Sequence, residues 1–265
     1  MANDRVPFDI DVGIDMGGMI FEKITEKVKK HPVVIVGLPG IGLVGKIVAD
    51  YLIKQLKAKK FAIFYSPAFP PQVIMKRNGK VRMLSYRFYH ANVSSKEFIF
   101  LVGDIQPFEG EWQYAVCRGT LDFLYKFKPK EIITIGGYGT NQFIQKPRVL
   151  GAANAQFEID EYKKLGVVFG EARGSIIGAA GLFVAMGRFY GMPAICLMGE
   201  THGAYVDANA AKAVLEVIAK RFKLKIDYSE LEKKVRLTER AMREIEEELK
   251  KMQQPKEKEN LSYFR

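Results

Sequence analysis

Apolar runs that alternate with segments of helical spacing constrain the fold of this chain most. A continuous β-branched run such as 32–37 is typical of a strand buried on both faces of a sheet. The alternation predicts an α/β fold with a mostly parallel mixed sheet and helices on both faces. The apolar runs cover 32–37, 61–65, 98–104, 131–137 and 193–200, and the helical patterns cover 41–56, 112–127, 176–190 and 208–222.

Shorter strands are expected beside this alternation. An Asn-Gly pair at 78–79 lies between apolar runs at 73–75 and 81–84, which predicts a β-hairpin that adds antiparallel strands at one end of the sheet. Short strands are also expected within 148–155 and 167–169. Asp207 precedes the last core helix and is placed to cap it.

Charge and cysteine content narrow the function classes. The 265 residues carry a formal net charge of +11, with lysines dispersed over the body and no nucleic-acid-binding motif. Such an excess is typical of a solvated surface, of a thermophile protein or of a chain with an acidic protein partner, so no nucleic acid is expected. Cys117 and Cys196 lie in apolar contexts that indicate reduced thiols rather than a metal site. No stretch is long and apolar enough for a membrane, so we expect a cytoplasmic protein.

The C-terminal region separates from the core in its pattern. We expect a core domain over 1–228, an amphipathic helix over 229–254 and a flexible tail over 255–265. Ser229 and Glu232 form a capping-box pattern at the start of the helix. The narrow apolar stripe that follows predicts either packing on its own domain or a seam between copies of the chain. The stripe consists of Leu231, Val235, Met242, Ile245, Leu249 and Met252, with Thr238 inside it.

The tail carries apolar residues only at its tip, after the charged segment 256–260. The tip consists of Leu261, Tyr263, Phe264 and Arg265 with its carboxylate. Burying one large apolar side chain contributes about 1.5–3 kcal/mol of favourable free energy. A side chain on a water-exposed segment makes no such contribution. The pattern therefore predicts a segment that a partner buries, with a frayed terminus as the alternative.

The loop Gly40–Lys46 matches two nucleotide-binding motifs in part. The G-x-G-x-x-G pattern at Gly40–Gly45 lacks the acidic residue expected about 20 positions on, where lysines stand at 57–60. This counts against NAD and leaves NADP open. The Walker A pattern fails because position 47 is isoleucine, which has no hydroxyl for magnesium. A tight strand–helix turn is the structural alternative.

Two other segments stand at expected strand ends. The glycine-rich stretch 136–140 predicts either an anion-binding nest or a strand end that needs positive φ. Glu200 and His202 place a carboxylate and an imidazole at the carboxyl end of a strand, where α/β enzymes hold their chemistry. No geometric partner for either is visible in sequence, and no cofactor is expected.

The ordered set of these blocks resembles the proteasome assembly chaperone family, in its archaeal branch. The blocks are 32–45, 103–107, 135–137 and 199–203, followed by Val206-Asp207 and an alanine-rich helix. The resemblance implies a three-layer α/β/α sandwich that is similar to nucleoside phosphorylases but has no known catalytic residues. It thus implies a protein that is not an enzyme.

The resemblance also implies a role for the tail. Proteasome activators and some of these chaperones insert a C-terminal hydrophobic–Tyr–any residue tail between α-subunits of the core particle, where its carboxylate pairs with a pocket lysine. Here Tyr263 takes the hydrophobic position, Phe264 the tyrosine position and Arg265 the last position. Phe264 departs from the pattern because it lacks the phenolic OH, whose hydrogen bond is worth about 0.5–1.5 kcal/mol. The alternative is that Tyr263 enters the pocket in a shifted register.

We therefore expect an ATP-independent chaperone or activator that docks on the α-ring of the core particle as a homo-oligomer, a tetramer or pentamer, through several tails. The alternative is a phosphorylase-like hydrolase or a nucleotide-binding enzyme that uses the Gly40–Lys46 loop with Glu200 and His202. A third possibility is a general holdase with Phe69-Pro70-Pro71 as its apolar surface.

Overall fold

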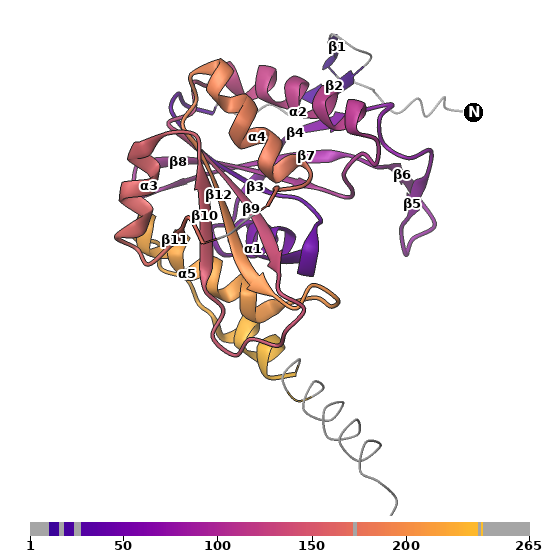
Figure 1. Cartoon of the computed structure of the whole chain (residues 1–265). Helices are drawn as coiled ribbons and strands as arrows, with labels where there is room; N and C mark the ends of the chain where they lie inside the picture. Colours follow the sequence, from indigo (N-terminus) through magenta and orange to yellow (C-terminus); the bar gives the residue numbers. More distant parts are fainter. Residues whose placement is uncertain (1–10, 16–18, 24–27, 172–173, 238–239, 241–265) are drawn as a thin grey trace, which may run out of the picture.

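A mixed sheet forms the centre of the molecule (Figure 1). The computed structural model describes residues 11–15, 19–23, 28–171, 174–237 and 240. Within them the main sheet has ten strands in the order β1-β2-β4-β7-β8-β3-β9-β12-β10-β11. The strands are β1 Asp11–Asp15, β2 Met19–Lys23, β3 Val33–Gly37, β4 Lys59–Tyr65, β7 Tyr86–Val93, β8 Lys96–Gly103, β9 Glu131–Gly139, β10 Val149–Ala153, β11 Val168–Phe169 and β12 Ala194–Thr201.

Helices cover both faces of this sheet, as the sequence predicted. They are η1 Ile41–Leu43, α1 Val44–Gln55, α2 Gly110–Tyr125, α3 Gln156–Lys163, α4 Ala179–Gly187, η2 Arg188–Tyr190 and α5 Ala208–Phe222. The helices α2 and α4 cover one face, where Leu121 and Phe183 are buried. The helices α1 and α5 cover the other face, where Leu52 is buried. Successive residues of β3 point to the two layers, Val34 to the first and Ile35 to the second. Both faces of β3 are therefore apolar, which explains its continuous β-branched run.

The parallel part of the sheet is narrower than the sequence predicted. Only β8, β3, β9 and β12 form a continuous parallel block in the described sheet. Antiparallel strands flank it, with β7, β4, β2 and β1 on one side and β10 on the other. The predicted hairpin forms as β5 Val73–Met75 and β6 Val81–Met83, but it is a separate two-stranded sheet that extends away from the main one (Figure 1).

Strand β7 has no counterpart among the predicted elements. It is joined to β8 by the two-residue turn Ser94–Ser95, and both residues have positive φ, 49° and 63°. That geometry normally selects Asn-Gly, so a Ser-Ser pair gives little sequence signal for a hairpin.

The start of α5 confirms the predicted cap. Asp207 accepts hydrogen bonds from the backbone N–H groups of Asn209 and Ala210 through Oδ1. Helix α4 is shorter than the predicted 176–190, because Gly178 has φ of 89° and breaks the helix before Ala179. No helix in the described ranges has the length and apolarity needed to cross a membrane.

The beginning of the C-terminal helix packs on its own domain. Residues 229–237 are helical, and Leu231 is only 1% exposed within the core cluster beneath α1 and α5. Val235 packs against the same cluster. Leu231 is therefore a core residue of its own subunit and not a free seam residue. The predicted capping box also differs, since Asp227 accepts from the backbone N–H of Ser229 and the Glu232 carboxylate pairs with Lys212 at 3.1 Å.

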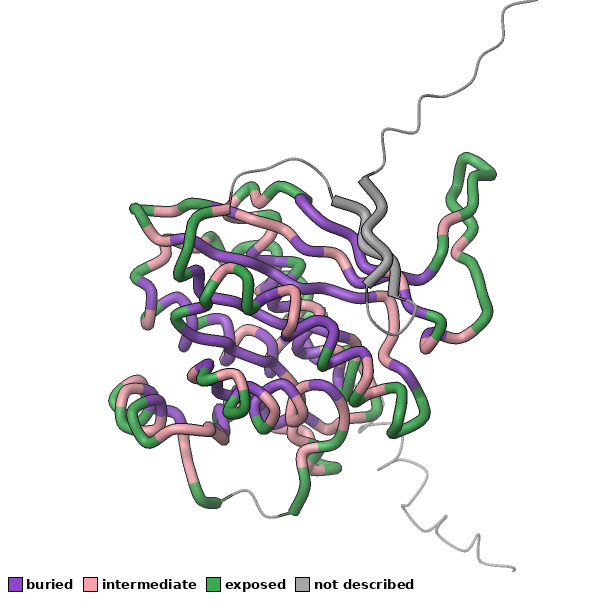
Figure 2. Tube along the Cα trace, turned by 90° about the horizontal axis from the view of Figure 1, so that it is seen from above, coloured by how far each residue is buried: buried purple, intermediate pink, exposed green. Residues whose placement is uncertain are grey.

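Buried residues follow the middle of the sandwich, and exposed ones lie at its rim (Figure 2). Phe69, proposed from sequence as part of an exposed holdase surface, is only 6% exposed and packs on Tyr86 with ring centroids 5.0 Å apart. That expectation was wrong, because the aromatic ring completes the core beside β4 and β7.

Candidate functional site at the carboxyl edge of the sheet

The Gly40–Lys46 loop is a tight turn packed directly on the sheet. A Cβ at Gly45 would lie 2.4 Å from the carbonyl oxygen of Ile135 in β9, and a Cβ at Gly37 would lie 2.2 Å from the carbonyl oxygen of Gly45. The turn itself needs a left-handed residue at Gly42, with φ of 61°. These glycines thus allow the first turn of α1 to touch β9, which is the role that the structural alternative gives them.

The lysine of this loop is engaged on its own helix. Lys46 Nζ lies 2.6 Å from Asp50 Oδ2, four residues further along α1. In a Walker motif the same lysine would reach the phosphates. The loop therefore fits the structural alternative better than either nucleotide-binding motif.

The glycines of 136–139 continue strand β9 and do not have positive φ. The stretch therefore forms no nest, and β9 ends within it at Gly139, as the second expectation had it, but without the positive φ. A Cβ at Gly137 would lie 2.4 Å from the carbonyl oxygen of Ile41, so this glycine is required by the close approach of the turn. A Cβ at Gly136 would have ordinary van der Waals neighbours, Met198 Cγ at 3.8 Å and Ala180 Cβ at 4.0 Å.

The carboxylate of Glu200 is bound by an arginine and is therefore not free to accept a proton. Arg148 Nη2 lies 2.6 Å from Glu200 Oε1, and the backbone N–H of Arg148 donates to Oε2 at 3.0 Å. These hydrogen bonds keep the pKa of the Glu200 carboxyl below its usual value. The carboxylate therefore ties the end of β12 to the start of β10.

His202 lies in different surroundings from Glu200. Its ring packs against Tyr205 with centroids 5.5 Å apart, and Nδ1 is buried without a hydrogen-bond partner among the described residues. Between them, Thr201 Oγ1 donates to Asp207 Oδ2 at 2.7 Å, which anchors the cap of α5. The structure thus does not bring the predicted carboxylate and imidazole together as a pair.

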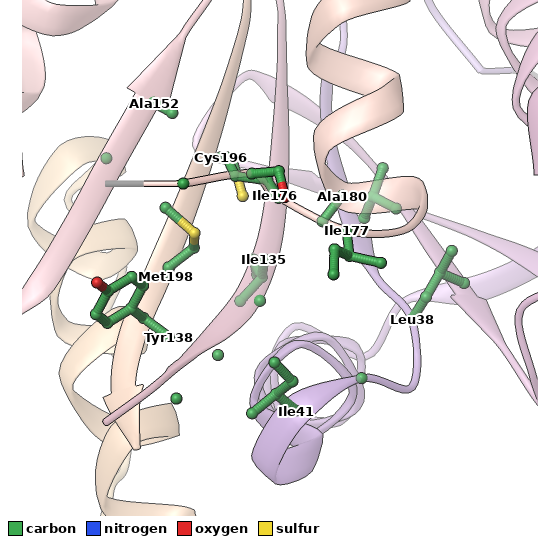
Figure 3. Close-up of a pocket in the computed structure, with 18 of the residues that line it drawn as sticks. Leu38, Ile41, Ile135, Tyr138, Ala152, Ile176, Ile177, Ala180, Cys196 and Met198 are labelled. Atoms are coloured by element: carbon green, nitrogen blue, oxygen red, sulfur yellow. The ribbon is translucent and has the colours of Figure 1, made fainter. Parts of the chain in front are cut away.

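A cavity of about 460 Å³ opens beside these residues, on the face of the sheet that carries α4 (Figure 3). Its floor comes from β9, β12 and β10, and its walls come from the turn after β3, the segment after β8 and the segment before α4. Sequence reasoning missed this cavity because it is assembled from segments far apart in the chain. The lining residues include Leu38, Ile41, Gln106, Gly136, Tyr138, Ile176, Ile177, Ala180, Cys196 and Met198.

Gln106 holds two walls of the cavity in place. Its Nε2 donates to the carbonyl oxygen of Pro39 at 2.6 Å, and its Oε1 accepts from the backbone N–H of Ala179 at 2.8 Å. Both ends of the amide are therefore satisfied by the walls themselves. This contact gives a structural reason for the Gln106 part of the 103–107 block.

Asp104 in the same block fastens the β5–β6 hairpin. Arg82 and Arg87 donate to its carboxylate, with Arg82 Nη2 at 2.9 Å and Arg87 Nη1 at 2.8 Å. Burial alone would raise the pKa of Asp104, but the two arginines hold it well below its usual range. Asp104 is thus an ionised structural group.

The tail and most of the seam lie outside the described residues. These are Met242, Ile245, Leu249, Met252, Leu261, Tyr263, Phe264 and Arg265.

Most of this chain matches known proteins in sequence. Residues 34–246 match the PAC2 family. The uncharacterized protein MJ1210 of Methanocaldococcus jannaschii is 35% identical over 251 residues, which is 91% of this chain and 97% of that protein.

Two solved structures from Pyrococcus furiosus extend the likeness. PbaB, an archaeal proteasome activator, superposes with a TM-score of 0.82 at 38% identity, over 87% of this chain and all of PbaB. PbaA, an archaeal homolog of proteasome-assembly chaperone, superposes with a TM-score of 0.72 at 26% identity, over 88% of this chain and 94% of PbaA. The family match and these superpositions agree with the geometry above, and the chain belongs to the PAC2 family.

Proposed function

We propose that this chain is an ATP-independent chaperone or activator of the proteasome that docks on the α-ring of the core particle through its C-terminal tail. The observation that carries the proposal is the similarity to PbaB, which covers all of that activator. The likeness to PbaA is lower in both identity and TM-score, which favours an activator over an assembly chaperone.

The geometry of the carboxyl edge supports a role in binding rather than catalysis. Lys46 is paired with Asp50, and Glu200 is paired with Arg148. A general base needs a free, oriented group within reach of a substrate proton, and neither Lys46 nor Glu200 is free. His202 Nδ1 is buried against Tyr205, and Glu200, the carboxylate two residues before it, is already bound to Arg148. We therefore assign no catalytic residue.

The tail itself would act through Tyr263, Phe264 and the carboxylate of Arg265, with Leu261 beside them. One such tail binds weakly. Several tails on one homo-oligomer would bind together, since a tethered second contact has an effective concentration in the millimolar range. The apolar stripe beyond Val235 would provide the contact between subunits, a tetramer or pentamer, through Met242, Ile245, Leu249 and Met252.

A capture experiment with immobilised archaeal α-rings tests this proposal. The full chain should be retained, and a chain that ends at Asn260 should be lost from the rings. Ser262→Ala is the matched control, because it alters the tail without removing an apolar anchor. Equal retention of the full chain and the truncated chain would overturn the tail-docking proposal.

A further inference from the structure

The cavity lies where two neighbouring parallel strands part. The ladder between β3 and β9 ends at the pair Val36 and Thr134, and β3 itself ends at Gly37. Strand β9 continues beside β12 as far as Gly139. The crevice left by the departing strand is the position where open α/β sheets bind their ligands.

The chemistry of the lining selects the kind of ligand. Among the described lining residues none has a charged side chain, and most are aliphatic or glycine. Gln106 is the most polar of them, and both ends of its amide are bonded to the walls. Burial raises the pKa of the Cys196 thiol to about 11, so it is neutral at pH 7. A charged ligand would lose its hydration here without gaining a counter-charge from these residues.

The floor of the cavity is open because Gly136 has no side chain. Its neighbour Gly137 is required by the turn, and Gly45 is required by β9. Neither a close contact nor a positive φ requires glycine at position 136. A Cβ there would sit 3.8 Å from Met198 Cγ and 4.0 Å from Ala180 Cβ. A larger residue at this position would occupy the empty volume, so the volume depends on this glycine.

The mouth of the cavity exposes apolar side chains. Ile177 is 87% exposed and Ile41 is 51% exposed, and both line the cavity. Figure 3 shows them around the same space as Ile135 and Met198. A ligand that covers exposed aliphatic groups at a concave apolar site removes them from water, and this burial favours binding.

We infer that this cavity is a binding site for an uncharged, largely apolar small molecule. Its volume of about 460 Å³ falls within the range of about 300–1,000 Å³ that is typical of ligand pockets. The ligand would rest on Gly136 and Met198 and be covered by Ile41 and Ile177, and Ser175 and Tyr138 would offer hydroxyl groups at the lining. None of the described lining residues belongs to the tail segment 255–265, so the inference does not depend on proteasome docking.

A fluorescence titration of the full chain tests the inference with two probes that share one ring skeleton. N-phenyl-1-naphthylamine is uncharged, whereas 8-anilinonaphthalene-1-sulfonate adds a sulfonate. The uncharged probe should bind saturably at one site per subunit, at least about tenfold tighter at that site than the anionic one.

Three variants assign the site. Gly136→Leu fills the cavity from its floor and Ala180→Leu fills it from α4, and each should weaken binding of the uncharged probe at least about tenfold. Gly110→Leu is the matched control, because Gly110 is exposed with open space around it, and affinity should stay within about twofold. Should one cavity variant fail to fold, the other still decides.

The opposite results would overturn the inference. These are non-saturable binding of the uncharged probe, or equal affinity in the control and in a folded cavity variant. Repeating the titration on the chain that ends at Asn260 separates this inference from the docking proposal, because probe binding should not change there.

Discussion

At the carboxyl edge of the parallel strands arginines pair with the carboxylates, whereas at the amino edge two buried carboxyl groups are poorly paired. Asp104 lies between Arg82 and Arg87, and Glu200 is bound by Arg148. The pKa of each of these two carboxyls is lowered.

The amino edge contains Glu131 and Glu158. Glu131 accepts from Tyr162 Oη at 2.7 Å, but its contact with Arg221 is 4.0 Å long. Glu158 is 1% exposed, and its Oε2 has no hydrogen-bond partner among the described residues. Burial raises the pKa of both carboxyls. Glu97 at the same edge differs, because His90 and Asn92 hydrogen-bond to it and its pKa is lowered despite burial.

The difference shows that a carboxyl group at the carboxyl edge of an α/β sheet is not a reactive group by its position alone. The carboxyl edge is where α/β enzymes place their reactive groups. Here its carboxylates are held ionised by arginines and connect neighbouring segments of the fold. The two carboxyl groups with raised pKa, Glu131 and Glu158, lie at the other edge, and a carboxyl of raised pKa more often marks a catalytic acid. The two edges should therefore respond to pH in opposite directions.

The largest expected effect concerns the packing that fixes the carboxyl edge. Gly45→Val would force side-chain atoms against the carbonyl oxygen of Ile135, and we expect the free energy of unfolding to fall by more than about 3 kcal/mol. Gly136→Ala is the control, with an expected change within about 0.5 kcal/mol. Urea unfolding measures both. Similar stabilities for the two variants would show that the turn is not tightly packed on β9.

The next effect concerns Asp104. Asp104→Asn leaves Arg82 and Arg87 without their carboxylate and should cost about 3 kcal/mol at pH 7. Because the folded pKa is lowered, the stabilisation is complete well above the unfolded pKa of about 3.9 and is lost progressively as pH falls from that value towards the folded pKa.

The measurement is urea unfolding of Asp104→Asn and the parent chain between pH 7 and pH 3, where the gap should narrow on acidification. Asp50→Asn, in the exposed pair with Lys46, is the control and should change stability by less than about 1 kcal/mol. A gap of constant size down to pH 3 would contradict an ionised, stabilising Asp104.

The smallest effect has the opposite sign at the amino edge. The folded pKa of Glu131 is raised, so the folded state keeps its proton longer than the unfolded chain, whose pKa is about 4.3. The stability of the parent chain relative to Glu131→Gln should thus fall as pH rises above about 4, by less than about 1.5 kcal/mol, the size of one hydrogen bond. Unfolding at pH 4, 5.5 and 7 measures this, and a rise with pH would refute the contrast between the edges.

Local signals in the sequence predicted much of the fold. The β-branched run at 32–37, the Asn-Gly turn and the cap at Asp207 each involve neighbouring residues, and the structure confirms the elements they predict. Strand β7 could not be predicted in the same way, because Ser94–Ser95 adopts a glycine-like turn without the usual residues.

The candidate site was harder to predict because its contacts are distant in sequence. No residue near Glu200 in the sequence predicts that Arg148 will bind it. In the same way, no residue near Gln106 predicts its hydrogen bonds to Pro39 and Ala179. Gly136 and Gly137 are equivalent in sequence, yet one is required by packing and the other leaves a cavity. Such differences arise only when the strands are brought together.

The most direct test of the docking proposal is the equilibrium affinity of the full chain for archaeal α-rings in a series at Phe264, measured by sedimentation velocity. We predict that Phe264→Ala loses most of the affinity and that Phe264→Tyr binds about two- to tenfold tighter, because the phenolic OH restores one hydrogen bond. Identical affinities for the parent chain, Phe264→Ala and Phe264→Tyr would contradict docking through the tail.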